Sequence, residues 1–116
     1  MTGKKLNSGS KGKRGECEAA AELIRLFRCE ARRGRQYQGS PESPDIKTTI
    51  PKVHFEVKRT EYLSLYAAMD QAEEDAGTDI PVVLHRRNNK DWLAIVALDD
   101  LPGLVKILSK LLKERE

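Results

Sequence analysis

The stretch from Ser43 to Arg59 reads SPDIKTTIPKVHFEVKR. Its second half alternates apolar and polar residues, which predicts a β-strand with one buried face. On that strand Glu56 and Lys58 point to the same face. Asp45 follows Pro44 at the start of the stretch. Two carboxylates and an ammonium on one rim of a sheet are suited to holding a divalent metal beside a phosphate.

Length and composition favour one small globular domain. The chain has 116 residues, of which 39% are hydrophobic and 34% charged, enough for one modest core. No apolar run approaches the ~20 residues of a membrane span, and the polar, basic amino terminus does not resemble a signal peptide. Cys17 and Cys29 lack metal-ligand spacing, so we interpret them as free thiols in a reducing cytosol.

Basic residues are unevenly distributed, although the net charge is only +3. Five of them precede the first acidic residue, Glu16, and three arginines cluster at 32–35. Such blocks can lie along a phosphate backbone and release counterions, although a solvated surface is the alternative. The predicted DNA contacts are Lys11, Lys13, Arg14, Arg32, Arg33, Arg35 and Arg59.

The amino-terminal third divides into an arm and a helix. Residues 1–11 are rich in Lys, Gly, Ser and Asn, which predicts a flexible basic arm before a single domain at 12–116. A helix is expected from about Gly12–Gly15 to Arg28. Its buried stripe, at helical spacing, is predicted to contain Ala20, Leu23, Ile24 and Phe27.

Glu16 is predicted to lie on the buried side of this helix, within roughly 40° of the apolar stripe at ~100° per residue. Burying an unpaired carboxylate is costly, so Glu16 needs a partner such as a metal or a lysine at the sheet rim. Glu18 lies away from the stripe, and a favourable interaction with the helix dipole is enough to explain an acidic residue at this position.

The remaining pattern predicts the order α-β-β-β-α-β-β-α, of the α/β (α+β) class. The first three strands are expected to form a β-meander with the acidic residues on one edge. Gln71 lies off the buried stripe of the second helix and is available for a polar contact. The expected elements after the first helix are strands at 29–37, 45–48 and 53–59, a helix from Thr60 or Ser64 to Ala76, strands at 81–86 and 92–98, and a helix from Asp99 or Asp100.

The acidic residues carry the chemistry of a Mg²⁺ site, because this ion prefers hard oxygen ligands. Asp45, Glu56 and the backbone carbonyl of Val57 can supply three oxygens. Glu16 can join directly, through water, or by holding a second ion. Lys58 would face the same pocket, where its ammonium can orient an attacking water or stabilise charge on the phosphate.

These residues resemble a known motif. Pro44-Asp45 followed by Glu56-Val57-Lys58 matches the PD-(D/E)xK motif of the restriction-endonuclease-like nucleases. Residues 12–16 (Gly-Lys-Arg-Gly-Glu) are similar to the Gly-x-x-x-Glu element on the first helix of resolvase-like members, and Gln71 resembles a glutamine on their next helix. The likeness covers about residues 12–98 and is greatest to archaeal-type and phage Holliday junction resolvases.

The resemblance implies a restriction-endonuclease-like core, αβββαβ, with an added strand and a carboxy-terminal helix around a central mixed sheet. It implies a Mg²⁺-dependent enzyme, with Mn²⁺ as a substitute, in a prokaryotic or phage-infected cytoplasm. A homodimer would nick branched DNA symmetrically in recombination or repair. In the site, Asp45 and Glu56 become metal ligands, Lys58 the catalytic lysine, Glu16 the helix-borne acid and Gln71 a supporting pocket residue.

Some alternatives remain open at this stage. His54 shares the Glu56 face and can touch DNA or a metal, but we favour a solvent-facing histidine. His85, among aliphatic residues, is expected to be hydrogen-bonded in the interior or at an edge. Glu61 can pair with Lys58 in a purely structural role. The alternative functions are a nicking or general endonuclease of the same fold and a non-catalytic DNA-binding module.

Overall fold

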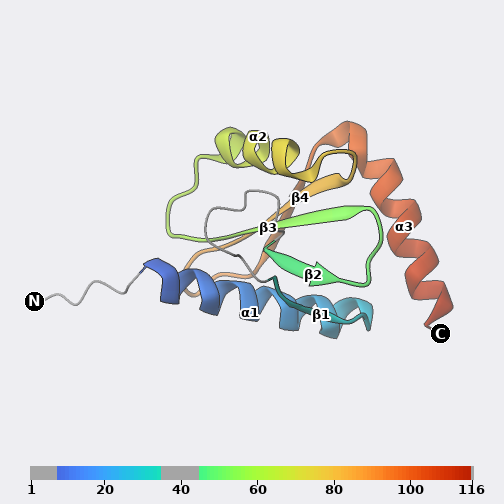
Figure 1. The fold of residues 1–116 in the computed structure, drawn as a ribbon, viewed down its shortest axis with the longest axis horizontal. Coiled ribbons are helices and arrows are strands. Elements are labelled where there is room, and N and C mark those ends of the chain that lie inside the picture. The colour runs from blue at the N-terminus through green and yellow to red at the C-terminus, as the bar shows by residue number, and fades with distance from the viewer. Residues whose placement is uncertain (1–7, 35–44, 116) are drawn as a thin grey trace, which may run out of the picture.

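A computed structural model describes residues 8–34 and 45–115. They form an α+β fold in which helices surround a mixed three-stranded sheet (Figure 1). The elements are α1 (Ser8–Phe27), β1 (Ala31–Arg33), β2 (Ile46–Thr48), β3 (Val53–Arg59), α2 (Leu65–Ala76), β4 (Ile80–Arg86), β5 (Leu93–Val96), the 3₁₀ helix η1 (Leu98–Asp100) and α3 (Leu101–Glu114).

The sheet has the order β3-β4-β5, with β3 parallel to β4 and β4 antiparallel to β5. Its central strand, β4, is the most apolar, and Val82 and Val83 are fully buried. Parallel neighbours need a crossover connection, which α2 supplies. The parallel register pairs Glu56 with Val83 and Lys58 with His85, so the polar residues of β3 lie beside the sheet's central strand.

The predicted meander is wrong in one respect. β1 and β2 form a separate antiparallel pair, and no hydrogen-bonded ladder joins β2 to β3 among the described residues. The amide of Val57, on β3, instead donates to the carboxylate of Asp45, next to β2, at 2.8 Å. A side chain therefore replaces part of the strand pairing. β1 and β5 are also shorter than predicted, and residues 35–37 lie outside the described residues.

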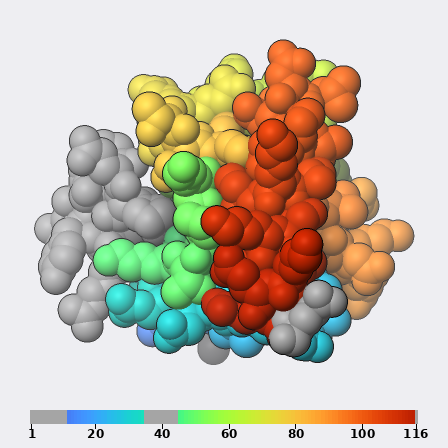
Figure 2. All heavy atoms as spheres, turned by 90° about the vertical axis from the view of Figure 1, so that its right-hand side faces the viewer, coloured from blue at the N-terminus to red at the C-terminus, as the bar shows by residue number. Residues whose placement is uncertain are grey.

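Helices cover both faces of the sheet (Figure 1). α1 and α3 pack on the face that contains Phe55, and α2 packs on the other face over Val83. Figure 2 shows α3 lying across one end of the molecule. Its last residues are tied to the end of α1, because Arg115 donates to the Arg28 carbonyl at 3.1 Å and Arg28 donates back at 3.3 Å.

The buried stripe of α1 is shifted from the predicted one. Ala20 and Leu23 are buried as predicted, but Ile24 is 45% exposed and Ala19 takes its place in the core. α1 begins at Ser8, within the segment predicted as an arm, and residues 1–7 lie outside the described residues. Across the described ranges, none of the helices has the length and apolarity that a membrane crossing requires.

Gly15 sets how closely α1 approaches β3. A Cβ at Gly15 would lie 2.6 Å from the Cβ of Arg59, which real carbon atoms do not tolerate. A Cβ at Gly12, one turn earlier, would meet nothing within 4 Å. The close approach at Gly15 brings the next residue, Glu16, to the edge of the sheet.

We therefore expect opposite effects from alanine at the two glycines. Gly15→Ala should lower the free energy of unfolding by about 1–3 kcal/mol, because the helix must move away from Arg59. Gly12→Ala should raise it by about 0.5–1 kcal/mol, because alanine is the better helix former. Urea denaturation measures both, and an equal stabilisation by the two changes would contradict the proposed contact.

Candidate active site

The two faces of β3 have different partners, as the alternation predicted. Lys58 donates from Nζ to Gln71 Oε1 on α2 at 3.0 Å. Phe55 packs on the opposite face against Ala19 and Leu23 of α1. Gln71 was predicted to be available for a polar contact and, by the resemblance, to support the pocket, and it accepts a hydrogen bond from the lysine of the motif.

Asp45 is fixed at the outer edge of β3. It is 8% exposed, and its Oδ2 accepts the hydrogen bond from Val57 N–H. Burial raises the pKa of Asp45 from 3.8 to about 7, and the carboxylates of Glu56 and Glu16 act in the same direction. The Val57 hydrogen bond and Lys58 oppose the rise in the pKa. The predicted acidic residues and the lysine are thus close enough to affect one ionisation.

Glu16 is buried, as its place on the helix predicted, with an exposed fraction of 8%. Its partner is Arg33 on β1, whose Nε lies 2.7 Å from Glu16 Oε1. Neither a metal nor a lysine was needed to explain the burial of this carboxylate. Arg33, predicted as a DNA contact, therefore pairs with an acidic residue of the site, and its side chain is 37% exposed.

The interpretation of His54 as a solvent-facing residue is wrong. His54 is 6% exposed, and its Nε2 lies 2.9 Å from Glu56 Oε1. That hydrogen bond raises the pKa of His54, against the opposite effect of burial. Burial alone would raise the pKa of Glu56, but His54 and Lys58 hold it below its usual value. Alternation identified the face correctly but could not show that α2 covers it.

Asp75 is a member of the site that the sequence did not suggest. It lies in the last turn of α2, half-buried, and partial burial and the neighbouring Glu56 carboxylate raise its pKa. Ligand atoms of His54, Glu56 and Asp75 all lie within 4.8 Å of one another. The one sequence signal for Asp75 is that it directly precedes Ala76, which lies on the buried side of α2.

Glu61 does not pair with Lys58 in the described structure. It accepts a hydrogen bond from the backbone N–H of Asn88 at 2.6 Å and lies 3.9 Å from Arg59 Nη1. Arg59 also donates to Asn88 Oδ1 at 2.9 Å and has a side chain that is only 15% exposed. Arg59, another predicted DNA contact, is thus held within the protein.

The other predicted DNA contacts differ in exposure. Lys13, Arg14 and Arg32 are exposed, as a contact with a phosphate backbone requires. Lys11 and Arg35 lie outside the part of the chain whose side chains the structure describes. His85 is hydrogen-bonded in the interior, as predicted, with Nε2 3.0 Å from the Thr60 carbonyl oxygen.

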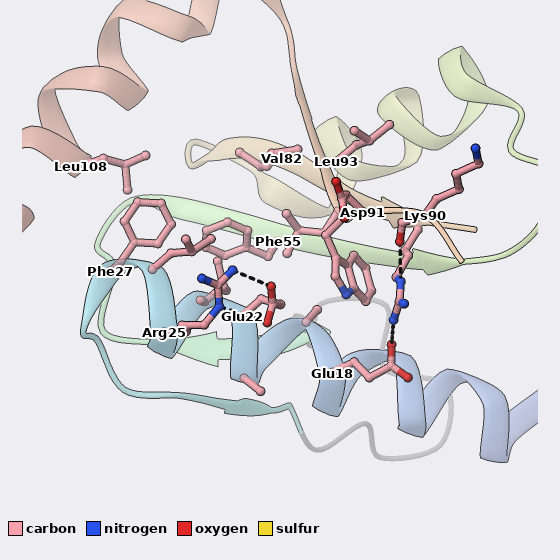
Figure 3. Close-up of a pocket in the computed structure, with 18 of the residues that line it drawn as sticks. Glu18, Glu22, Arg25, Phe27, Phe55, Val82, Lys90, Asp91, Leu93 and Leu108 are labelled. Atoms are coloured by element: carbon pink, nitrogen blue, oxygen red, sulfur yellow. Dashed lines mark hydrogen bonds and ion pairs between the residues drawn. The ribbon is translucent and has the colours of Figure 1, made fainter. Parts of the chain in front are cut away.

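A groove of about 730 Å³ opens on the opposite face of the sheet, between α1 and α3. Figure 3 shows Phe27 and Phe55 directed into it. At its rim, Glu18 accepts a hydrogen bond from Arg86 at 3.0 Å. Because Phe55 and Glu56 point to opposite faces of β3, this groove is separate from the candidate site.

Comparison with known proteins adds no assignment. Neither a protein-family model, nor a curated protein, nor a solved structure matches this chain.

The raised pKa of Asp45 predicts a pH-dependent effect of Asp45→Asn. The folded protein holds the proton of Asp45 more tightly than the unfolded chain does. The wild type therefore becomes less stable as the pH rises from 3.8 through about 7. Asparagine can still accept from Val57 N–H but cannot ionise. In EDTA at pH 8 the variant should be more stable by up to about 4 kcal/mol, and the gain should vanish near pH 4.

Urea denaturation at both pH values measures this effect, with Asp99→Asn as the control at an exposed position. The control should change stability little at either pH. A destabilisation by Asp45→Asn of the same size at pH 4 and pH 8 would show that Asp45 is ionised at little cost in the folded protein.

Proposed function

We propose that this chain is a Mg²⁺-dependent endodeoxyribonuclease of the PD-(D/E)xK type, and that it resolves Holliday junctions by symmetric nicks. The single observation that carries the proposal is the convergence of Asp45, Glu56 and Lys58 at the edge of β3, with Gln71 on the lysine. A sequence motif identifies these residues, and the contacts between them in the folded chain are a separate observation.

The donor set fits a hard divalent cation. Asp45 and Glu56 offer carboxylate oxygens, and the Val57 carbonyl is part of the same strand. Burial raises the pKa of Asp45, the Glu56 and Glu16 carboxylates add to the rise, and a bound dication would offset their repulsion. Mn²⁺ offers similar coordination and would substitute. Glu16 is already held by Arg33 at 2.7 Å, which favours a role through water.

Each side chain would have a distinct task. A bound Mg²⁺ would polarise the scissile phosphate and lower the pKa of an attacking water. Lys58 would orient that water or stabilise charge on the phosphate, and Gln71 would keep its ammonium directed towards the site. The exposed Lys13, Arg14 and Arg32 would contact the DNA backbone.

The proposed nuclease would have a restriction-endonuclease-like core. A helix before the motif strand and a parallel β3–α2–β4 crossover support a restriction-endonuclease-like core. Two symmetric nicks need two sites, which a two-fold homodimer supplies. We place the activity in the cytoplasm of a prokaryotic or phage-infected cell, in DNA recombination or repair.

Two ion pairs favour a second candidate, a non-catalytic DNA-binding module. Arg33 neutralises Glu16 at 2.7 Å, and His54 lies 2.9 Å from Glu56. In such a module these acidic residues would serve only to order basic neighbours for binding. A nicking or general endonuclease of the same fold would share the first candidate's site and differ only in its substrate.

Cleavage of labelled four-way junction, duplex, flap and single-stranded DNA tests the proposal. The junction should be cut with Mg²⁺ or Mn²⁺ and not with EDTA. Asp45→Ala and Lys58→Ala should each lower the rate ~100-fold or more, because they remove a metal ligand and a stabilising charge. Asp99→Ala and Lys106→Ala, at exposed positions on η1 and α3, should leave it unchanged.

Full junction cleavage by Asp45→Ala would exclude the proposed mechanism. Salt-sensitive DNA binding with no metal-dependent cleavage would support the binding module instead. Equal cleavage of duplex and junction would favour a general endonuclease of the same fold.

A further inference from the structure

A histidine and two carboxylates meet between β3 and α2 beside the nuclease motif. His54 and Glu56 are two residues apart on one face of β3, and Asp75 reaches them from the last turn of α2. His54 is 6% exposed and Glu56 is 5% exposed. One donor atom from each residue lies within 4.8 Å of the other two.

The separation of the His54 and Glu56 donor atoms is close to that of two ligands on one metal ion. Two ligands that are each ~2.1 Å from an ion, at right angles or tetrahedral angles, are about 3.0–3.4 Å apart. The distance from His54 Nε2 to Glu56 Oε1 is 2.9 Å. Asp75 is half-buried, so a change of rotamer can bring its carboxylate closer.

An ion pair between His54 and Glu56 explains only two of the three side chains. Asp75 lies beside Glu56, where partial burial, the Glu56 charge and a side-chain hydrogen bond to Glu56 all raise the pKa of Asp75. Burying a charged pair gives little net stability, because desolvation offsets the attraction. A dication at the centre of the three groups would satisfy both carboxylates together.

The imidazole nitrogen determines which metals fit. Mg²⁺ prefers oxygen ligands, whereas Zn²⁺ and Mn²⁺ accept a mixed set of imidazole and carboxylates. We propose that His54, Glu56 and Asp75 bind a divalent transition-metal ion, at a site that shares Glu56 with the Mg²⁺ site of the nuclease proposal. The donor geometry carries this inference, and it does not require the chain to cleave DNA.

Calorimetric titration of the full chain with Zn²⁺ tests the proposal. All variants carry Cys17→Ser, because the exposed thiol of Cys17 would otherwise compete for Zn²⁺. His54→Gln and Asp75→Asn should each weaken Zn²⁺ binding at least tenfold. The matched controls are His85→Gln, on the neighbouring strand, and Glu74→Gln, exposed on the same helix. Both controls should bind Zn²⁺ as the Cys17→Ser protein does.

A second measurement needs no substitution in the site. The chain has two histidines, so ¹⁵N-histidine labelling gives two imidazole signal sets that His85→Gln assigns. Zn²⁺ should shift the Nε2 resonance of His54 and leave that of His85 in place. If the His54 resonance does not respond, or if His54→Gln binds Zn²⁺ unchanged, the proposed site is overturned.

These outcomes are separate from those of the nuclease test. Coordination of Zn²⁺ by His54 in a chain that does not cleave DNA would contradict the nuclease proposal and support this one. Mg²⁺-dependent cleavage with no response of His54 to Zn²⁺ would have the reverse meaning.

Discussion

The hydrogen bond from the Val57 amide to the Asp45 carboxylate is the contact on which the site depends. It uses a backbone donor at the edge of β3 that a neighbouring strand would otherwise occupy. The residue before β2 consequently contacts β3 through its side chain, and no ladder joins β2 to β3 among the described residues. The same bond holds a carboxylate in a buried position beside Glu56, where burial raises its pKa to about 7.

The crossover helix completes the site for a related reason. Two parallel neighbours cannot be joined by a tight turn, so α2 must pass over one face of the sheet. That face contains the polar residues of β3. Gln71 and Asp75 lie on α2 at helical spacing, and they reach Lys58 and Glu56 respectively. Because of this topology, polar side chains of α2 cover the polar face of β3.

Local patterns in the sequence correctly predicted the features that depend on a single helix or strand. The burial of Glu16, the two faces of β3 and the position of Gln71 off its buried stripe all follow from helical or strand periodicity. Pairings between distant elements could not be predicted in this way. The contact of Arg33 with Glu16 depends on how β1 packs against α1, and periodicity carries no information about it.

The same limit explains the wrong predictions. His54 was placed on the correct face of β3, but whether that face meets solvent depends on α2. Ile24 fits a helical stripe as well as Ala19 does, and the side chain that becomes buried depends on how closely α1 approaches the sheet. Gly15 sets that approach through its contact with Arg59, a residue 44 positions later in the chain.

The balance of charge in the site connects its two proposed metal positions. Glu16 has a counter-charge in Arg33, whereas Lys58 acts on both Asp45 and Glu56, and His54 acts on Glu56. A protonated His54 on Glu56 and a metal bound by both His54 and Glu56 would be alternatives, because a coordinating imidazole must give up its proton. In the proposed sites the buried carboxylates would face a cation in either state, namely the imidazolium of His54 or a metal ion. That cation would determine whether His54 donates a hydrogen bond to Glu56 or coordinates the metal beside it.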